Sequence, residues 1–345
     1  MPTSVESTLP ILEERTGAVV PVYFSEGADV ELGTKLLRDT VFGLVRELKQ
    51  PRHICLAVDG SETAKNAILQ MAQEFGVTAI SQPKNFGKLN AVRHGMETLL
   101  EDQSLDLDYL AVIDADGDHF ANALLDFIRA AEHVRTVTAT EKVLVLGNRL
   151  SRHRPMGFGR GELEELGDRI LLDALVYDAA VTGIPLRLLF SNTLDEFPDF
   201  HSGYKVFSRA SAEDVFLAEP ILAGCEPIPY YRHSVEAVMV VEAIKAGAVL
   251  STVSRRTYDE QAITEFGKLD RVELIADLII WPCRRLRIPP DFVAAWMANH
   301  VQRLQLATLV PEGREELLAI RERVFEAIGI ELEVEVDPFA RNLFV

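Results

Sequence analysis

Residues 109–119 read Tyr-Leu-Ala-Val-Ile-Asp-Ala-Asp-Gly-Asp-His. An apolar run of strand length is followed by carboxylates at every second position, Asp114, Asp116 and Asp118. The run predicts a buried strand, and the carboxylates gather negative charge where the chain leaves the core. Such a cluster is costly unless a cation neutralises it. Because hard divalent ions prefer oxygen ligands, we expect a metal site here, with a solvated Asp- and Gly-rich turn as the simpler alternative.

Strand and helix patterns alternate around this stretch, from about residue 18 to residue 147. Further strands are expected at 19–24, 54–58, 77–81 and 143–147, with helices between them. This alternation predicts an α/β fold with a mostly parallel sheet flanked by helices on both faces. Ligands bind beyond the carboxyl ends of such strands, and Asp59, Lys84 and the Asp-rich stretch all fall at such ends.

Beyond Gly147 the pattern changes. A basic loop with glycine and proline at 152–161 leads into a helix expected at 162–180. A short strand is expected at 204–207, a helix at 233–246 and a strand at 248–254. The remaining chain predicts a helical C-terminal extension with helices at 268–286, 291–306 and 312–328.

The average surface is acidic, because the 345 residues carry a net charge of −18 at pH 7. General nucleic-acid binding needs a basic face that displaces counterions, so we expect no nucleic-acid partner. The same charge disfavours simple electrostatic adhesion to anionic lipid. Hydrophobic residues at 48% and charged residues at 26% are ordinary values for a globular chain with a sizeable core.

Three cysteines, Cys55, Cys225 and Cys283, lie far apart and form no Cys-x-x-Cys pair. This spacing is typical of a reduced, cytosolic chain. No apolar run reaches the ~20 residues of a spanning helix, so we expect a cytoplasmic protein without a transmembrane segment. Peripheral contact with the inner face of the membrane is the alternative. The apolar stretch 279–281, followed by arginines, lies either at such an interface or in a helix packed on the core.

Eight short motifs follow one another in the order found in a known family. They are Pro-Val-Tyr (21–23), Val-Asp-Gly-Ser (58–61), Asn-Phe-Gly-Lys (85–88), Asp-Ala-Asp-Gly-Asp-His (114–119), Gly-Asn-Arg (147–149), Asp-Phe-His-Ser-Gly-Tyr-Lys (199–205), Glu236 with Lys-Ala-Gly (245–247), and Glu-Phe-Gly-Lys (265–268). The chain thus resembles the family-2 glycosyltransferases of GT-A fold, especially their polyprenyl-phosphate (dolichyl-phosphate) hexose synthase branch. Each motif alone is weak, and their common order carries the resemblance.

The resemblance implies a GT-A-like catalytic domain at 17–270, with a nucleotide-binding half at 17–147 and an acceptor half at 148–270. The helical C-terminal extension then occupies 271–345. The implied activity is a metal-dependent, inverting transfer of a hexose from a nucleotide diphosphate sugar, a GDP- or UDP-hexose. The acceptor is a lipid phosphate, such as a polyprenyl phosphate, or a soluble hydroxyl. Many relatives of the lipid-phosphate branch carry membrane helices after the catalytic domain, and this chain has none by sequence.

By this resemblance, Pro21, Tyr23 and Asp59 border the nucleotide base. Glu26 matches the glutamate that the family has after its Pro-Val-Tyr only if one extra residue is allowed. Lys88 meets the diphosphate or the base region. The simpler readings are a capping or turn carboxylate for Asp59 and a solvated surface charge for the lysine.

The resemblance assigns the Asp-rich stretch to the ribose and the metal. Asp114 contacts the ribose or the metal, and Asp116 ligates a divalent ion, Mg²⁺ or Mn²⁺, that bridges the diphosphate. Asp118 stands where the lipid-phosphate branch often has Gln, a neighbouring metal ligand. A cation at this place stabilises the negative charge that a departing nucleoside diphosphate gains.

Asp199 matches the aspartate of the family's Asp-x-x-Ser-Gly. With a hydroxyl acceptor it is the expected general base, whereas with an already ionised phosphate acceptor it orients rather than abstracts a proton. Arg149 is expected at the sugar or the phosphates. Arg160, Arg256 and Lys268 are expected at phosphate groups of donor or acceptor, the last two flanking a mobile loop with its tip at 258–266. The simpler alternatives are an ordinary loop charge for Arg160 and a surface hairpin or linker for the loop.

Two other classes of protein share parts of this pattern. Asp-x-Asp-Gly after an apolar strand also resembles the nucleophile motif of haloacid-dehalogenase-like phosphatases, although that motif normally stands near the start of its domain. A non-catalytic nucleotide-sugar-binding protein is the third reading. Such a protein would bind nucleotide with metal and never transfer the sugar.

Overall fold

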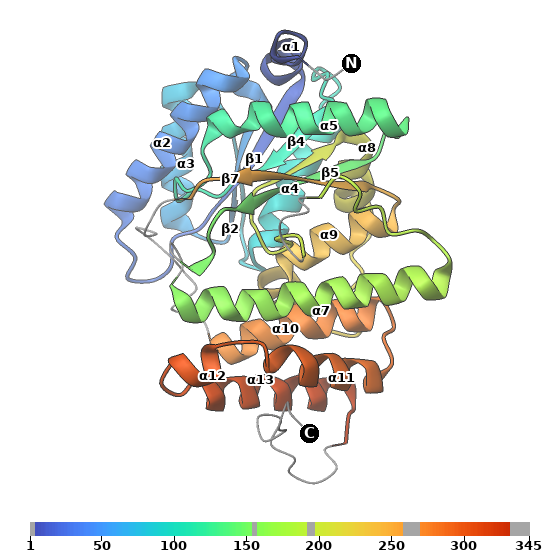
Figure 1. Ribbon diagram of the computed structural model, residues 1–345. Helices are drawn as coiled ribbons and strands as arrows, with labels where there is room; N and C mark the ends of the chain where they lie inside the picture. Colours follow the sequence, from blue (N-terminus) through green and yellow to red (C-terminus); the bar gives the residue numbers. More distant parts are fainter. Residues whose placement is uncertain (1–3, 154–156, 192–196, 258–269, 332–345) are drawn as a thin grey trace.

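Seven strands form one sheet in the computed structural model, which describes residues 4–153, 157–191, 197–257 and 270–331 (Figure 1). Across the sheet the strands follow the order β3-β2-β1-β4-β6-β5-β7. Their bounds are β1 Thr16–Val22, β2 Ile54–Asp59, β3 Thr78–Gln82, β4 Tyr109–Val112, β5 Val143–Arg149, β6 Lys205–Ser208 and β7 Val249–Arg255. The register places Val20 beside Leu56, Ala18 beside Ala111 and Val145 beside Ser251.

Strand β6 runs antiparallel to both of its neighbours, β4 and β5, whereas the pairs β1–β2, β2–β3, β1–β4 and β5–β7 are parallel. All the strands other than β6 therefore point their carboxyl ends to one edge of the sheet. The chain enters β6 at that same edge. This geometry matters below, because residues that precede β6 meet residues that follow the other strands.

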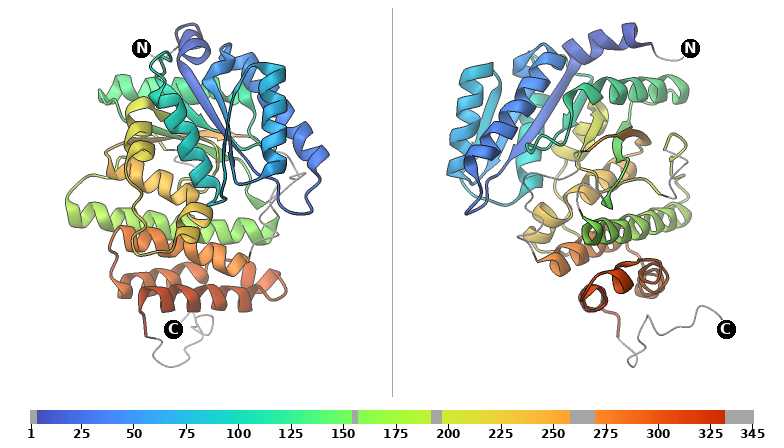
Figure 2. Two further views of the ribbon diagram at one scale, coloured as in Figure 1. Left: turned by 180° about the vertical axis from the view of Figure 1, so that it is seen from behind. Right: turned by 60° about the vertical axis from the view of Figure 1, so that its left-hand side comes forward.

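Helices cover both faces of the sheet, as the sequence predicts (Figure 2). One face packs against α1 Val5–Arg15, α2 Val30–Leu48, α3 Glu62–Phe75 and α5 Leu124–Thr138. The other packs against α4 Lys88–Glu101, α7 Phe158–Thr182, α9 Val235–Lys245 and the C-terminal helices. Short helical turns complete the chain: η1 Pro51–His53, η2 Ala121–Ala123, α8 Arg209–Ala212, η3 Glu213–Leu217 and η4 Pro229–His233.

Local signals placed several elements well. A helix was expected between the strands at 54–58 and 77–81, and α3 fills this interval, with Ser61 capping it by accepting a hydrogen bond from the Ala64 amide. Other bounds differ. The strand expected at 19–24 is β1 Thr16–Val22, and the strand expected before the Asp-rich stretch, β4, ends at Val112, two residues before Asp114. Helix α1 was not predicted. It contains Pro10, three glutamates and a serine, which leave little apolar periodicity.

The C-terminal residues that the structure describes are helical, as expected. They form α10 Arg271–Arg285, α11 Pro290–Val301, α12 Leu306–Leu309 and α13 Gly313–Ile328. Helix α10 contains Pro282 within its last turn. Its stretch 279–281 is buried in the core that also contains strand residues, so the packed-helix interpretation holds over this stretch. Within the described residues, no helix combines the length and apolarity needed to cross a membrane.

A substitution at Trp281 tests whether α10 is part of the hydrophobic core that also contains strand residues. Its ring is fully buried and its Nε1 donates to the Ile221 carbonyl at 3.0 Å. We expect Trp281→Ala to lower the free energy of unfolding by about 3–5 kcal/mol, because a large cavity opens beneath the sheet. Urea denaturation followed by circular dichroism measures this loss. Trp296→Ala, at a half-buried position on α11, should cost less; equal costs would contradict the prediction.

Candidate active site

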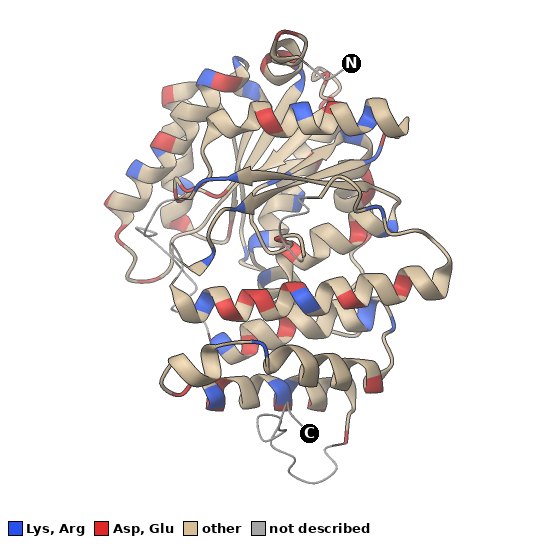
Figure 3. Cartoon of the chain, viewed as in Figure 1, with Lys and Arg blue, Asp and Glu red and all other residues tan. Residues whose placement is uncertain are grey.

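The carboxyl edge of the sheet collects the polar residues that the sequence singled out. Asp59 ends β2, Arg149 ends β5 and Arg255 ends β7, while Asp114 follows β4 by two residues. Asp199 lies in the segment that enters β6, and the reversed direction of β6 brings it to this edge. Figure 3 shows basic and acidic residues interspersed near this edge and along α7.

Asp59 anchors the loop that leads into α4. Its buried carboxylate accepts hydrogen bonds from the Gly87 amide and the Asn90 side chain, both at 2.6 Å, and from the Phe86 amide. Gly60 must be glycine here, because its φ is +67° and a Cβ would lie 2.2 Å from the Asn85 nitrogen. Asp59 therefore fixes the start of α4; its contact with a base stays a prediction.

Lys88, the first residue of α4, pairs with two carboxylates. Its Nζ lies 2.8 Å from Asp114 Oδ1 and 2.9 Å from Glu236 Oε1. Burial opposes charge on Lys88, but the two carboxylates raise its pKa overall. Burial alone would raise the pKa of Asp114, yet the charge of Lys88 holds it well below its ordinary value. Asp114 is thus ionised and already neutralised by a lysine.

His119 and Gly203 fix the position of Asp114. The Asp114 amide donates to His119 Nδ1 at 2.9 Å, so the proton of the neutral ring sits on Nε2, 3.7 Å from Asp114 Oδ2. Burial, followed by the charge of Arg255, lowers the pKa of His119. A Cβ on Gly203 would lie 2.5 Å from Asp114 Oδ2, so a side chain there would displace the carboxylate.

Asp116 and Asp118 have different surroundings. Asp118 is buried, and Arg255 Nη1 lies 3.3 Å from its Oδ2 and donates to its carbonyl at 3.1 Å. Asp116 has no Lys or Arg within ion-pair distance in the described part of the chain, and its Oδ1 accepts the Asp118 amide. Burial and then the Asp114 charge raise the pKa of Asp116 to about 6. Its carboxylate lacks the positive charge that its neighbours have.

The expected cluster of three metal-binding carboxylates is therefore divided. Lys88 holds Asp114, Arg255 holds Asp118, and Asp116 alone offers an uncompensated hard-oxygen ligand, which fits a divalent cation that takes its other ligands from a diphosphate. Among the described residues, the three side chains that gather ligand atoms within 4.8 Å are instead His153, Glu162 and Glu165. Glu162 caps the Gln305 and Leu306 amides, and Glu165 pairs with Arg169.

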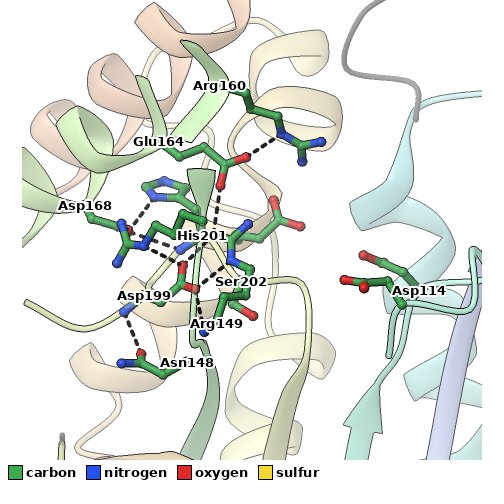
Figure 4. Close-up of polar contacts among 12 residues, drawn as sticks. Asp114, Asn148, Arg149, Arg160, Glu164, Asp168, Asp199, His201 and Ser202 are labelled. Carbon is green, nitrogen blue, oxygen red and sulfur yellow. Dashed lines mark hydrogen bonds and ion pairs between the residues drawn. The ribbon is translucent and has the colours of Figure 1, made fainter. Parts of the chain in front are cut away.

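Arg149 and Asp199 form a buried ion pair on the β5 side of the edge (Figure 4). The guanidinium donates from Nε to Asp199 Oδ2 and from Nη2 to Asp199 Oδ1, both at 2.6 Å, and from Nη2 to Glu164 at 2.8 Å. The Asp199 amide is held by the Asn148 side chain. Burial would raise the pKa of Asp199, but Arg149 and Arg152 lower it far below its ordinary value. Asp199 holds Arg149 and is a poor proton acceptor.

Helix α7 extends this network with Glu164 and Asp168 (Figure 4). Arg160 Nε donates to Glu164 Oε1 at 2.8 Å. Asp168 accepts Arg152 at 2.5 Å, and its other oxygen lies 2.7 Å from His201 Nδ1. Glu164 therefore links Arg160 to the ion pair of Arg149 and Asp199, and the functional roles of these residues stay predictions.

The remaining predicted residues lie outside these networks. Pro21 is half-buried in β1, while Tyr23 and Glu26 are exposed beyond its end, the tyrosine by 48%. Arg256 is exposed, next to the buried Arg255. Lys268 and the loop tip 258–266 lie outside the described residues.

Sequence reasoning gave no role to several residues that the structure places in the site. Glu236 and Lys205 were quoted only as parts of motifs, and the structure leaves Lys205 with no exposed surface. A lysine inside the apolar strand Lys205–Ser208 was the available signal, because a buried charge needs a local reason. Glu236 gave no such signal, because an acidic residue is common in the first turn of a helix, where it interacts favourably with the helix dipole.

Comparison with known proteins identifies the family. The chain matches the model described as Glycosyl transferase family 2 over residues 18–216, which is more than half of its 345 residues. The protein therefore belongs to glycosyl transferase family 2, and the predicted family is confirmed. The match does not distinguish the polyprenyl-phosphate branch, and it favours a transferase over the phosphatase alternative.

Comparisons with solved structures and with curated sequences do not narrow the family further. Among solved structures, the chain aligns with the crystal structure of 4-diphosphocytidyl-2C-methyl-D-erythritol synthase from Anaerococcus prevotii DSM 20548. That alignment has 10% sequence identity and a TM-score of 0.39, and it covers 79% of this chain and 98% of that chain. A search of curated protein sequences finds no match.

Glu164 makes the network sensitive to acid. Burial opposes its charge, yet Arg149 and Arg160 lower its pKa from 4.5 to about 2. A lowered pKa in the folded state contributes stability above about pH 4.5, and this contribution is lost as the pH falls towards 2. We therefore expect the difference in melting temperature between wild type and Glu164→Gln to be largest above pH 5 and to shrink towards pH 2.

Thermal melts across this pH range measure the difference. Glu31→Gln, at a site with an 82% exposed side chain, is the control and should follow the wild type at every pH. A difference between wild type and Glu164→Gln that stays constant from pH 6 to pH 2 would show that Glu164 contributes no charge to the network.

Proposed function

We propose that this glycosyltransferase moves a hexose from a nucleotide diphosphate sugar to its acceptor by direct displacement with inversion, assisted by Mg²⁺ or Mn²⁺. The observation that carries the proposal is the uncompensated negative charge of the Asp116 carboxylate. Its carboxylate lacks a cationic partner in the described chain, lies beside two neutralised aspartates, and has its pKa raised to about 6. An ionic partner at that point lowers the cost of the local negative charge.

The donor half of the site follows from the same arrangement. We assign Asp116 as the principal metal ligand, with Asp114 and Asp118 beside it. Pro21, Tyr23, Glu26 and Asp59 remain the proposed nucleotide-binding residues, and Lys88 a diphosphate contact. A bound divalent ion supplies positive charge to the departing diphosphate. The protein contributes positioned groups that need little reorganisation, since Asp59 holds the loop before Lys88 and His119 holds Asp114.

For the acceptor we propose a phosphate group, as in the polyprenyl-phosphate branch. A general base works best when its pKa lies near the working pH. Asp199 is 1% exposed, paired with Arg149 and strongly acidic, so these properties suit it to orient Arg149 rather than to take a proton from a hydroxyl. An ionised phosphate needs no such base. Arg149 and Arg160, with Arg256 and Lys268, are the proposed contacts of phosphate groups.

We also propose that residues 17–270 form the catalytic domain, with the nucleotide half at 17–147 and the acceptor half at 148–270. The extension at 271–345 then serves to complete the core. Its described helices bury residues such as Trp281 and Leu317 in the cluster that contains Val19 and Leu110 of the sheet.

Asp116→Asn tests the metal assignment. We expect the stabilisation that a nucleotide sugar gains from Mn²⁺ to disappear, because the amide offers a weaker ligand without charge. Thermal-shift assays with UDP- and GDP-hexoses, each with and without Mn²⁺, measure this gain. Asp126→Asn, 62% exposed on α5, is the control and should keep it. A variant at Asp116 that keeps full metal-dependent turnover would remove the assignment.

Asp199→Asn tests the acceptor. With a phosphate acceptor we expect kcat to fall less than about tenfold, whereas loss of a general base costs about 10²–10⁴-fold. The assay follows hexose transfer to polyprenyl phosphate in detergent micelles and, in parallel, to soluble sugars. Turnover with a soluble hydroxyl only, lost in the variant, would contradict the phosphate proposal. Binding of nucleotide sugar without transfer to either acceptor would indicate a non-catalytic binder.

A further inference from the structure

Lys88 is shared between two carboxylates that belong to distant parts of the chain. Asp114 follows β4, and Glu236 lies in the first turn of α9, yet both approach the same ammonium group within 2.9 Å. The two contacts are nearly equal in length, 2.8 and 2.9 Å. The lysine can therefore give up one partner and keep a charge-assisted hydrogen bond to the other.

Glu236 is a rigidly held anion rather than a surface charge. Its side chain is 16% exposed, and the residues on either side of it in α9, Val235 and Ala237, are buried. Burial alone would raise its pKa, but Lys88 and the fully buried Lys205 together lower it. Lys205 donates to the Ser202 carbonyl, so its ammonium is fixed on the β6 side of Glu236. Glu236 thus stays charged beside Lys88.

A conflict arises when the proposed donor complex binds. Asp114 has a lysine as its counter-ion, and a divalent cation on the same carboxylate would place two positive groups within a few ångströms of each other. In a partly buried site such repulsion is screened far less than in water. Lys88 must then move away from Asp114, or it would weaken the binding of the cation. Without another anion within reach, its desolvated charge would be left uncompensated.

We propose that Glu236 is a positioning residue that retains the Lys88 ammonium when Asp114 turns to the divalent cation of the donor complex. The inference rests on the proposed function and adds to it a residue that need not touch the substrate. Lys88 then has two arrangements: shared between Asp114 and Glu236 in the free protein, and held by Glu236 beside the diphosphate in the complex. Glu236 thereby makes Asp114 available to the metal at little electrostatic cost.

Glu236→Gln tests this role by separating metal binding from nucleotide binding. With Gln at this position Lys88 depends on Asp114, so the cation competes with the lysine for that carboxylate. We expect the gain in affinity for UDP or GDP on adding Mn²⁺ to fall about tenfold, the factor that matches one charge-assisted hydrogen bond. Affinity without metal should not fall, because Lys88 remains positive and near the diphosphate. Titration calorimetry with UDP and with GDP, each with and without Mn²⁺, measures both quantities.

Glu242→Gln is a matched control on the same helix. Glu242 is 15% exposed and also paired, with Arg285 at 2.7 Å, but its partner lies on α10 and not at the carboxyl edge. This variant should keep the full gain from Mn²⁺. Glu236→Asp keeps the charge but retracts it by one methylene, so it should lose part of the gain; it carries the test if Glu236→Gln does not fold.

The possible outcomes distinguish a failure of this inference from a failure of the proposed function. A loss of nucleotide affinity with and without Mn²⁺ alike would show that Glu236 only supports the fold of the site, and an unchanged gain would show that Lys88 needs no second anion. Either result overturns the inference while the proposed function stands. If wild-type protein binds neither UDP nor GDP under any condition, the proposed function fails first, and the inference fails with it.

Discussion

Buried and half-buried carboxylates at the carboxyl edge of the sheet need nearby positive charge, and this requirement arranges the site. Lys88 neutralises Asp114, Arg255 neutralises Asp118 and Arg149 neutralises Asp199. Each pair joins segments that lie far apart in the sequence. Removing one member of a buried pair would leave a desolvated charge, which costs several kcal/mol. Asp116 is left without such a partner in the described chain, and its raised pKa marks the point where the site still lacks positive charge.

The reversed strand β6 connects the two halves of the site. Because β6 runs antiparallel to β4 and β5, the segment 197–204 reaches the edge where the other strands end. It brings Gly203 against Asp114 on one side and Asp199 against Arg149 on the other. The same strand carries Lys205 into the interior near Glu236. The residues around Asp114 and those around Arg149 are thus linked through a few residues of one segment.

The C-terminal helices act on the site from a distance. Asp277 of α10 lies 2.6 Å from His233 at the end of η4. The preceding residue, Arg232, donates to the Asn85 carbonyl of the loop that Asp59 also holds. A Cβ on Gly87 would meet Arg232 at 2.4 Å, so this loop is enclosed from both sides. The extension therefore helps to fix the place where α4 and Lys88 begin.

The sequence alone determined the alternation of strands and helices, the family and the set of charged residues at strand ends, because these depend on local periodicity and motif order. It did not determine how the charges divide among themselves. Asp114, Asp116 and Asp118 look alike as neighbours in a chain, and only the fold decides which of them meets Lys88, which meets Arg255 and which stays uncompensated. Ion pairing follows distance and burial in space, and Glu236 pairs with Lys88 only because the fold brings the first turn of α9 to the first residue of α4.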